Sequence, residues 1–81
     1  MSDSMVVERA EMLKMIAHLE EVVARLQDVN AGVSAEYADE LQRLRDRLLQ
    51  AQSPKEWRLL LDFAVEVLAI IAAELLKAWF L

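Results

Sequence analysis

Residues 52–57 read QSPKEW, and this short stretch carries the strongest helix-start signal of the chain. Ser53 has the side chain of a good N-cap, Pro54 suits the first helical position, and Glu56 stands three residues after the cap. This spacing is that of a capping box, in which each side chain accepts a hydrogen bond from the backbone of the other residue. The pattern predicts that a helix begins at Pro54 and that the preceding helix ends just before it.

A second break is predicted at residues 30–34, which read NAGVS. Asn30 and Gly32 follow a periodic apolar run and are typical of a helix stop, while Ser34 is placed to cap the next helix. Glycine and proline each occur once in the chain, so we expect three helices. Their expected ranges are about 4–30, 34–52 and 54–80, within a single domain over residues 1–81. Short connections favour an all-α, antiparallel up-down-up three-helix bundle with long first and third helices and a shorter second helix.

The composition fits a small helical domain and argues against several other classes of protein. With 81 residues the chain is only just long enough for one hydrophobic core, and it has no cysteine for disulfides or thiolate metal sites. Its apolar fraction is 57%, above the roughly 45–50% of typical soluble domains. The net charge of −5 argues against a nucleic-acid partner, because phosphate binding needs a basic surface. The opening residues MSDSMVVERAEM lack the basic region and long apolar run of a signal peptide, so we expect a cytoplasmic location.

The first two expected helices carry apolar seams of different widths. The helix over 34–52 has one narrow seam among charged residues, formed by Tyr37, Leu41, Leu44 and Leu48. The helix over 4–30 has a central stripe of Met5, Met12, Ile16, Leu19, Val23 and Leu26. More apolar residues flank this stripe, with Leu13, Ala17 and Ala24 on one side and Met15, Val22 and Val29 on the other. The apolar face of the first helix is therefore wider than the stripe of about 100° that a simple surface helix needs.

The helix expected over 54–80 is apolar almost all round. Its main apolar seam would be enough to pack this helix against the other two. The seam consists of Trp57, Leu61, Ala64, Leu68, Ile71, Leu75 and Ala78. Leu59, Phe63 and Ile70 point nearly the opposite way, among charged residues. Because a helix that is apolar all round is normally buried all round, we expect that two neighbouring helices cannot cover this one.

The expected helix lengths indicate a further excess of apolar surface at the ends of the bundle. At 1.5 Å per residue the first and third helices would each run roughly 40 Å, and the second about 27 Å. If the short helix fills the middle of the path, each long helix overhangs one end by about nine residues. The overhang of the first helix is then SMVVERAEM, residues 4–12, and that of the third is AELLKAWFL, residues 73–81.

Residues 59–81 are long enough to span a membrane, but their charges argue against it. Four charged residues interrupt the stretch, namely Asp62, Glu66, Glu74 and Lys77. Each charge near the centre of a span costs roughly 2.5–3.5 kcal/mol on insertion scales. A membrane surface would bury Trp79 and Phe80, but the basic flank that usually accompanies such an anchor is missing.

The side chains that could carry chemistry form no known catalytic or metal-binding pattern. His18 is the only histidine, and no glutamate lies three residues before it, as a carboxylate-bundle metal site would require. Asp62 and Glu66 stand four residues apart and are more simply explained as a solvated stripe. The arginines of RLRDRLL, residues 43–49, are interleaved with acidic residues, which is typical of a solvated helix. We therefore expect no enzymatic activity, no cofactor and no metal site.

These patterns predict a non-enzymatic protein–protein interaction module that forms a homo-oligomer, most simply a dimer. The candidate interaction surface lies on the third helix and comprises Leu59, Phe63, Val67, Ile70, Leu76, Trp79, Phe80 and Leu81. The first alternative is an adaptor or small chaperone that holds the helix of another protein in an apolar groove, formed by Leu59, Phe63, Val67 and Ile70. The second alternative is a peripheral membrane-associated helical protein.

Overall fold

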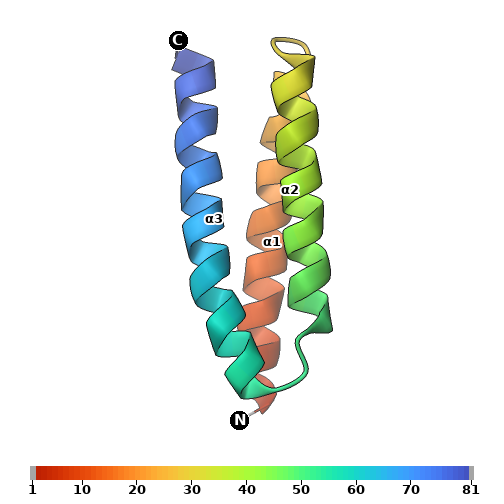
Figure 1. Ribbon diagram of the computed structural model, residues 1–81, viewed down its shortest axis with the longest axis vertical. Coiled ribbons are helices and arrows are strands. Elements are labelled where there is room, and N and C mark those ends of the chain that lie inside the picture. Colours follow the sequence, from red (N-terminus) through yellow and green to blue (C-terminus); the bar gives the residue numbers. More distant parts are fainter. Residues whose placement is uncertain (1, 81) are drawn as a thin grey trace.

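The structure is an all-α three-helix bundle, as the sequence predicts (Figure 1). This computed structural model describes the backbone of residues 2–80 and the side chains of residues 4–79. Helix α1 spans Ser2–Leu26, α2 spans Ala31–Gln50 and α3 spans Pro54–Phe80. The helices run up, down and up, so α1 and α3 are parallel and α2 is antiparallel to both. All three pairs of helices are in contact.

Helix α3 begins at Pro54, where the sequence predicts it. The Ser53 hydroxyl accepts a hydrogen bond from the Glu56 backbone N–H at 3.1 Å. The Glu56 carboxylate in turn accepts one from the Gln52 backbone N–H at 3.2 Å, one residue earlier than a standard capping box would place it. Local side-chain chemistry therefore determines the start of α3.

Helix α2 begins three residues earlier than predicted, and the assignment of Ser34 as its N-cap is wrong. Asn30 is the N-cap: its backbone is extended, and its side-chain oxygen accepts a hydrogen bond from the Val33 N–H at 3.2 Å. Gly32 lies in the first turn of α2 instead of ending α1. Asparagine and serine are about equally good N-cap residues, so α2 starts after Asn30, the first of the two along the chain.

Ser34 is buried and instead ties α2 to the end of α1. Its hydroxyl donates a hydrogen bond to the Val23 carbonyl at 2.8 Å. Val23 is one of the last four residues of α1, whose carbonyls lack partners within the helix. The Leu26 carbonyl accepts from the backbone N–H groups of Val29 and Asn30. The Ala24 carbonyl accepts from the Gln27 N–H, so the connection between α1 and α2 is a closed turn in which three of these four carbonyls are satisfied.

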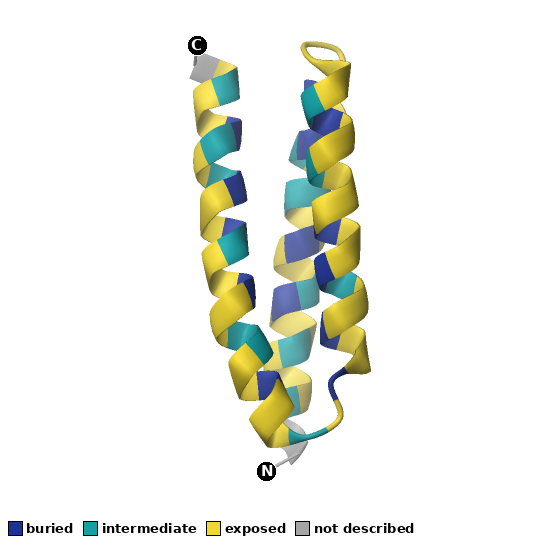
Figure 2. Cartoon of the chain, viewed as in Figure 1, coloured by how far each residue is buried: buried dark blue, intermediate teal, exposed yellow. Residues whose placement is uncertain are grey.

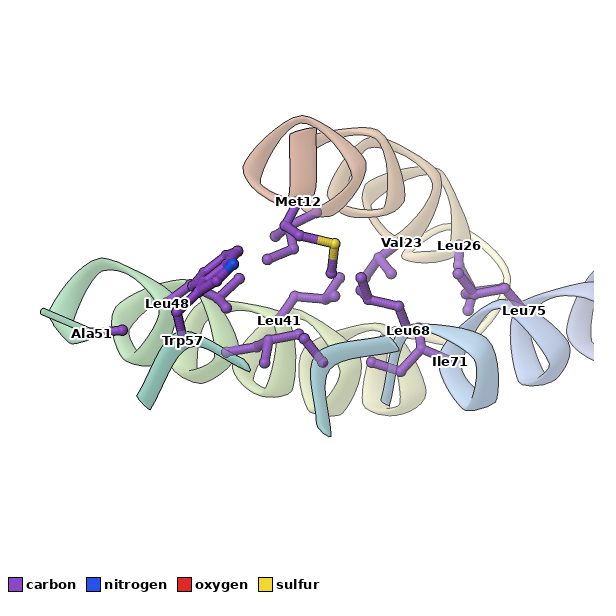
Figure 3. Close-up of a cluster of buried hydrophobic side chains, with 13 residues drawn as sticks. Met12, Val23, Leu26, Leu41, Leu48, Ala51, Trp57, Leu68, Ile71 and Leu75 are labelled. Atoms are coloured by element: carbon purple, nitrogen blue, oxygen red, sulfur yellow. The ribbon is translucent and has the colours of Figure 1, made fainter. Parts of the chain in front are cut away.

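The core runs along the inside of the bundle and follows the predicted seams (Figures 2 and 3). Its fully buried side chains come from all three helices, and the largest are Ile16, Val23, Leu26, Leu41, Leu48 and Ile71. The seam of α3 is buried at Trp57, Ala64, Leu68, Ile71 and Leu75, and half-buried at Leu61 and Ala78. In α2 the three leucines of the seam are buried, and Tyr37 is half-buried.

Polar contacts around Trp57 determine how α1 and α3 are aligned along their length. The indole Nε1–H donates a hydrogen bond to the Glu8 carboxylate at 3.1 Å, which joins residues 49 apart in sequence. The Arg9 guanidinium lies over the same ring, 5.5 Å from its centroid, and donates to the Ala51 carbonyl. Parallel helices have the same rise per residue, so each residue of α1 lies level with a residue about 49 positions later in α3.

The predicted overhang of AELLKAWFL is wrong for the described part of that stretch. Figure 1 shows the end of α3 level with the turn between α1 and α2. Leu75 is buried there, and Ala78 packs against the core. Figure 1 shows that the connection over residues 51–53 runs beyond the end of α2 before α3 begins, so α2 is the shorter helix at this pole and not beside the end of α3. Leu81 lies outside the described residues.

Replacing Asn30 with alanine should lower the free energy of unfolding by about 1 kcal/mol, because the Val33 N–H loses its acceptor. Gln27→Ala is the matched control, since it removes an exposed side chain from the same connection. Chemical denaturation followed by circular dichroism measures both variants. Equal stabilities of the two variants would show that Asn30 does not cap α2.

The Tyr37 hydroxyl reports whether the second half of α3 packs against α2. Burial, followed by the negative charges of Glu74, Glu36 and Glu40, raises the pKa of Tyr37 above its usual 10.0. Tyr37 is the only tyrosine, so its absorbance titration near 295 nm should have a midpoint above pH 10. Glu74→Gln should lower that midpoint. The neutral phenol stabilises the fold below pH 10, and this contribution is lost as the pH rises through the raised pKa. A midpoint that Glu74→Gln leaves unchanged would contradict the packing.

Candidate interaction surface

Helix α3 buries one stripe and leaves apolar side chains exposed on both of its flanks (Figure 2). Adjacent residues show the contrast: Ile71 is 1% exposed and Ile70 62%, while Leu75 is 3% exposed and Leu76 59%. Successive residues on a helix are turned by 100°, so a core stripe cannot include both members of such a pair. The apolar residues outside the stripe therefore face solvent.

One flank of α3 faces α2 and carries what we term the α2-side patch, namely Leu59, Phe63, Val67 and Ile70. Leu59, Phe63 and Ile70 are exposed, and Val67 is half-buried against the core. Phe63 and Val67 line a groove of about 530 Å³ between α2 and α3. The sequence predicts these four residues as neighbours. The structure places Phe63 and Val67 in one groove, and Leu59 in a neighbouring hollow with Arg47.

The α2 wall of this groove is charged. Glu40, Arg43, Asp46 and Arg47 line it. The Arg47 guanidinium lies over the Phe63 ring, 5.3 Å from its centroid, and shields part of its face. The groove therefore has one apolar wall and one solvated wall.

The other flank of α3 faces α1 and carries no charge over its last four turns. Val65, Ala69, Ala72, Leu76 and Trp79 follow one another at spacings of four, three, four and three, which places them in a line. Leu61 lies one turn before Val65 and shares a surface hollow with Met5 and Glu8 of α1. This line of residues therefore lies on the α1 side of α3.

Helix α1 and the turn after it contribute a matching line of apolar side chains. Met15 and Val29 are exposed, and Val22 is half-buried, at spacings of seven. With the offset of about 49 residues, Met15 and Val65 lie at a similar height along the bundle. We term the combined surface the α1/α3 face, which comprises Met15, Val22, Val29, Val65, Ala69, Ala72, Leu76 and Trp79. On α1 the exposed His18 and Arg25 lie on the same line, between Met15, Val22 and Val29, so only the α3 part of this face is free of polar side chains.

The structure divides the predicted interaction surface between two flanks. Leu59, Phe63 and Val67 lie beside α2, Ile70 is largely exposed, and Leu76 and Trp79 lie on the flank toward α1. The Phe80 side chain and Leu81 lie outside the described residues. Sequence reasoning missed Met15, Val29 and Val65 as members of one surface with Leu76. The apolar flank of the first helix is visible in the sequence, but only the alignment of α1 with α3 joins it to Leu76 and Trp79.

Chemistry-bearing side chains are sparse on this surface. His18 is exposed on α1. Among the described residues, no three acidic or histidine side chains are grouped to hold a metal ion. Within residues 2–80, no helix has the combination of length and apolar character that crossing a membrane requires.

No protein-family model, curated protein or solved structure matches this chain. Its function is therefore inferred from its own surface, on which exposed apolar side chains are the most prominent feature.

The neighbouring residues Leu75 and Leu76 provide a matched pair of substitutions. Leu75→Ala should lower the free energy of unfolding by about 2–5 kcal/mol, because it opens a cavity in the core. Leu76→Ala should change it by less than about 0.5 kcal/mol at low protein concentration, because the side chain is largely exposed. Thermal or chemical denaturation at a fixed dilute concentration makes the comparison. A large loss for Leu76→Ala would mean that this residue supports the fold of the single chain.

Proposed function

We propose that this protein is a non-enzymatic helical module that associates with itself through the exposed apolar surface of α3 and its neighbours. One observation carries the proposal. Large apolar side chains that face solvent are concentrated on α3, at Leu59, Phe63, Val65, Ile70, Leu76 and Trp79. Single exposed apolar residues are normal on a soluble domain, whereas aligned sets of them mark interaction sites.

The energetics favour a reversible complex. Burying a large apolar side chain contributes roughly 1.5–3 kcal/mol. Association costs an estimated 4–15 kcal/mol in lost translational and rotational freedom. Several of these side chains must therefore be buried together before a complex forms, which requires a continuous surface. A closed two-fold dimer is the simplest assembly that buries such a surface on both partners at once.

The two alternatives would use the same surface with a different occupant. An adaptor would hold an amphipathic helix in the groove beside Phe63 and Val67. A peripheral membrane protein would insert Trp79 at a lipid surface. Both alternatives leave the free protein monomeric, and only the second binds vesicles.

Sedimentation equilibrium over concentrations from roughly micromolar to millimolar tests the proposal. The mass should rise with concentration from 9.3 kDa for one chain toward twice that value. A mass of one chain at every concentration would reject self-association. Flotation with lipid vesicles that depends on Trp79 would then support the peripheral membrane protein.

A further inference from the structure

We infer that the partner is a second copy of this chain, which docks antiparallel on the face formed by α2 and α3, about a two-fold axis at the level midway between Glu40 and Arg43. This inference rests on the proposed self-association and specifies its surface and geometry. In this arrangement α2 of one copy packs on α2 of the other, and α3 packs on α3.

Four charged side chains on α2 form what we term the α2 charge row, which changes sign at its middle. Glu36 and Glu40 make up its first half, and Arg43 and Arg47 its second half. They follow one another at spacings of four, three and four residues, which places them on one face of the helix. Glu40, Arg43 and Arg47 line the groove between α2 and α3, so this face lies beside the α2-side patch.

The order of these charges is not the one that best stabilises α2 by itself. Glu36 and Glu40 stand four residues apart, as do Arg43 and Arg47, and like charges at this spacing slightly destabilise an isolated helix. Glu36, Glu40 and Arg47 are in none of the ion pairs formed among the described residues. The row therefore has charge to offer to a partner.

An antiparallel two-fold axis at the middle of the row places each of its charges opposite one of the other sign. Arg43 comes level with Glu40 of the second copy, and Arg47 comes level with Glu36 of the second copy. Around the axis the two Arg43 and the two Glu40 side chains alternate in sign. Because the row and its inverted copy are complementary, a second copy of the same chain supplies the matching charges.

The same axis brings the α2-side patch of one copy onto that of the other. Helices α2 and α3 are antiparallel, and the Arg47 guanidinium lies over the Phe63 ring, which relates the levels of the two helices. The axis therefore crosses α3 between Val67 and Ile70. Val67 comes level with Ile70 of the second copy, so apolar side chains meet beside the paired charges.

The end of the face that receives Arg47 of the second copy is acidic. Three carboxylates lie near the Tyr37 hydroxyl there, since burial, followed by the charges of Glu74, Glu36 and Glu40, raises the pKa of Tyr37. The rotation places a guanidinium of the second copy where these negative charges gather. Glu74 thus adds to the complementarity that the α2 charge row provides.

Parallel docking matches the same surface poorly. A two-fold axis along the bundle would place α2 of one copy on α3 of the other. The charged side chains of the row would then cover the apolar α2-side patch and lose water without gaining opposite charges. Glu36 would also come level with Glu74 of the second copy, which repels it. The surface therefore favours the antiparallel arrangement.

Other charged groups near this face have partners within their own chain, in the pairs Asp39–Arg43, Glu74–Lys77 and Asp46–Gln42. By helical spacing, Asp39 and Asp46 are turned farther from α3 than the row is, so they lie at the edge of the dimer. Asp46 comes level with a like charge there, Glu36 of the second copy, and solvent and salt screen this repulsion. The interface thus has an apolar part on α3 and a polar part on α2 whose outer edge stays in water.

The size of the shared surface indicates a weak dimer. Residues 33–50 of α2 and 60–77 of α3 overlap in the two copies, over about 27 Å. The bundle is 17 Å across, so each copy contributes about 450 Å², and the total of about 900 Å² lies below the roughly 1,200 Å² of standard interfaces. The dimer should therefore form and dissociate with concentration.

Cross-linking of single-cysteine variants tests the geometry, because the natural chain has no cysteine. With a short bismaleimide, Ile70→Cys should cross-link to itself near the axis. Leu59→Cys should not cross-link to itself, but should cross-link to Lys77→Cys when the two variants are mixed. Leu76→Cys, exposed on the other flank of α3, is the control and should give no dimer. Cross-linking of Leu59→Cys to Gln50→Cys and not to Lys77→Cys would indicate parallel docking and overturn the inference.

A charge swap tests the complementarity of the α2 charge row. An acidic variant carries Arg43→Glu and Arg47→Glu, and a basic variant carries Glu36→Lys and Glu40→Lys. Each variant alone should dimerise more than about a hundredfold more weakly than the wild type, because its row meets only like charges. An equimolar mixture of the two should form a dimer again, since every level then joins opposite charges. Circular dichroism should show both variants folded.

The control for the acidic variant carries Lys14→Glu and Arg25→Glu, which change the net charge equally on exposed positions of α1. At roughly 0.15 M salt its dissociation constant should stay within about threefold of the wild-type value, because these side chains lie away from the interface. A mixture of the acidic and basic variants that stays monomeric while the wild type dimerises would overturn the inference.

Two equally exposed apolar residues separate this inference from the proposed function. Ile70 is 62% exposed and Leu76 59%, on opposite flanks of α3. Ile70→Glu should abolish the dimer, and Leu76→Glu should leave its dissociation constant unchanged. The reverse result supports self-association but places it beside α1, which overturns the inference alone. A wild-type chain that stays monomeric at every concentration rejects both.

Discussion

The fixed turn of the α-helix is the constraint on which the surface of this protein depends. A helix with two neighbours buries one stripe, and its next residue along the chain is turned 100° away from that stripe. In α3 both residues of such pairs are apolar, so Ile71 and Leu75 enter the core while Ile70 and Leu76 face solvent. No rotation of α3 within a three-helix bundle would bury all four. A third neighbour would be needed, and a second copy can supply it.

Polar contacts at the two poles of the bundle determine which apolar residues become neighbours. At one pole Glu8 binds the Trp57 indole, and at the other Ser34 binds the Val23 carbonyl. These contacts keep the helices from sliding along one another. Apolar packing alone resists such sliding only weakly. Because of these contacts, the exposed apolar residues Met15 and Val29 lie at heights along the bundle similar to those of the apolar flank of α3. The grouping of these exposed apolar side chains is thus a consequence of hydrogen bonds that lie away from them.

The division of α3 into two unlike flanks bears on the choice of partner. Beside α2, the apolar side chains share a groove with arginine and acidic side chains, and Arg47 covers part of Phe63. Beside α1, the flank from Val65 to Trp79 is free of charge. Burying either surface would require the desolvation of polar or charged groups, because Arg25 and His18 lie among the apolar residues of α1 beside α3.

Local signals in the sequence determined the number of helices, the start of α3 at Pro54 and the buried seams, because capping and helical periodicity act within a few residues. The misplaced N-cap at Ser34 required a choice between two nearby capping residues, and the packing of α2 on α1 makes that choice through Asn30 and the buried Ser34 hydroxyl. The predicted overhang of AELLKAWFL depended on where the connection over residues 51–53 places the start of α3, which helix lengths do not determine. The sequence alone also showed that α3 has more apolar surface than two helices can cover. Only the tertiary structure decided that Leu76 and Trp79 join Met15 and Val29, because that grouping depends on the alignment of two helices whose contacting residues stand 49 apart in the chain.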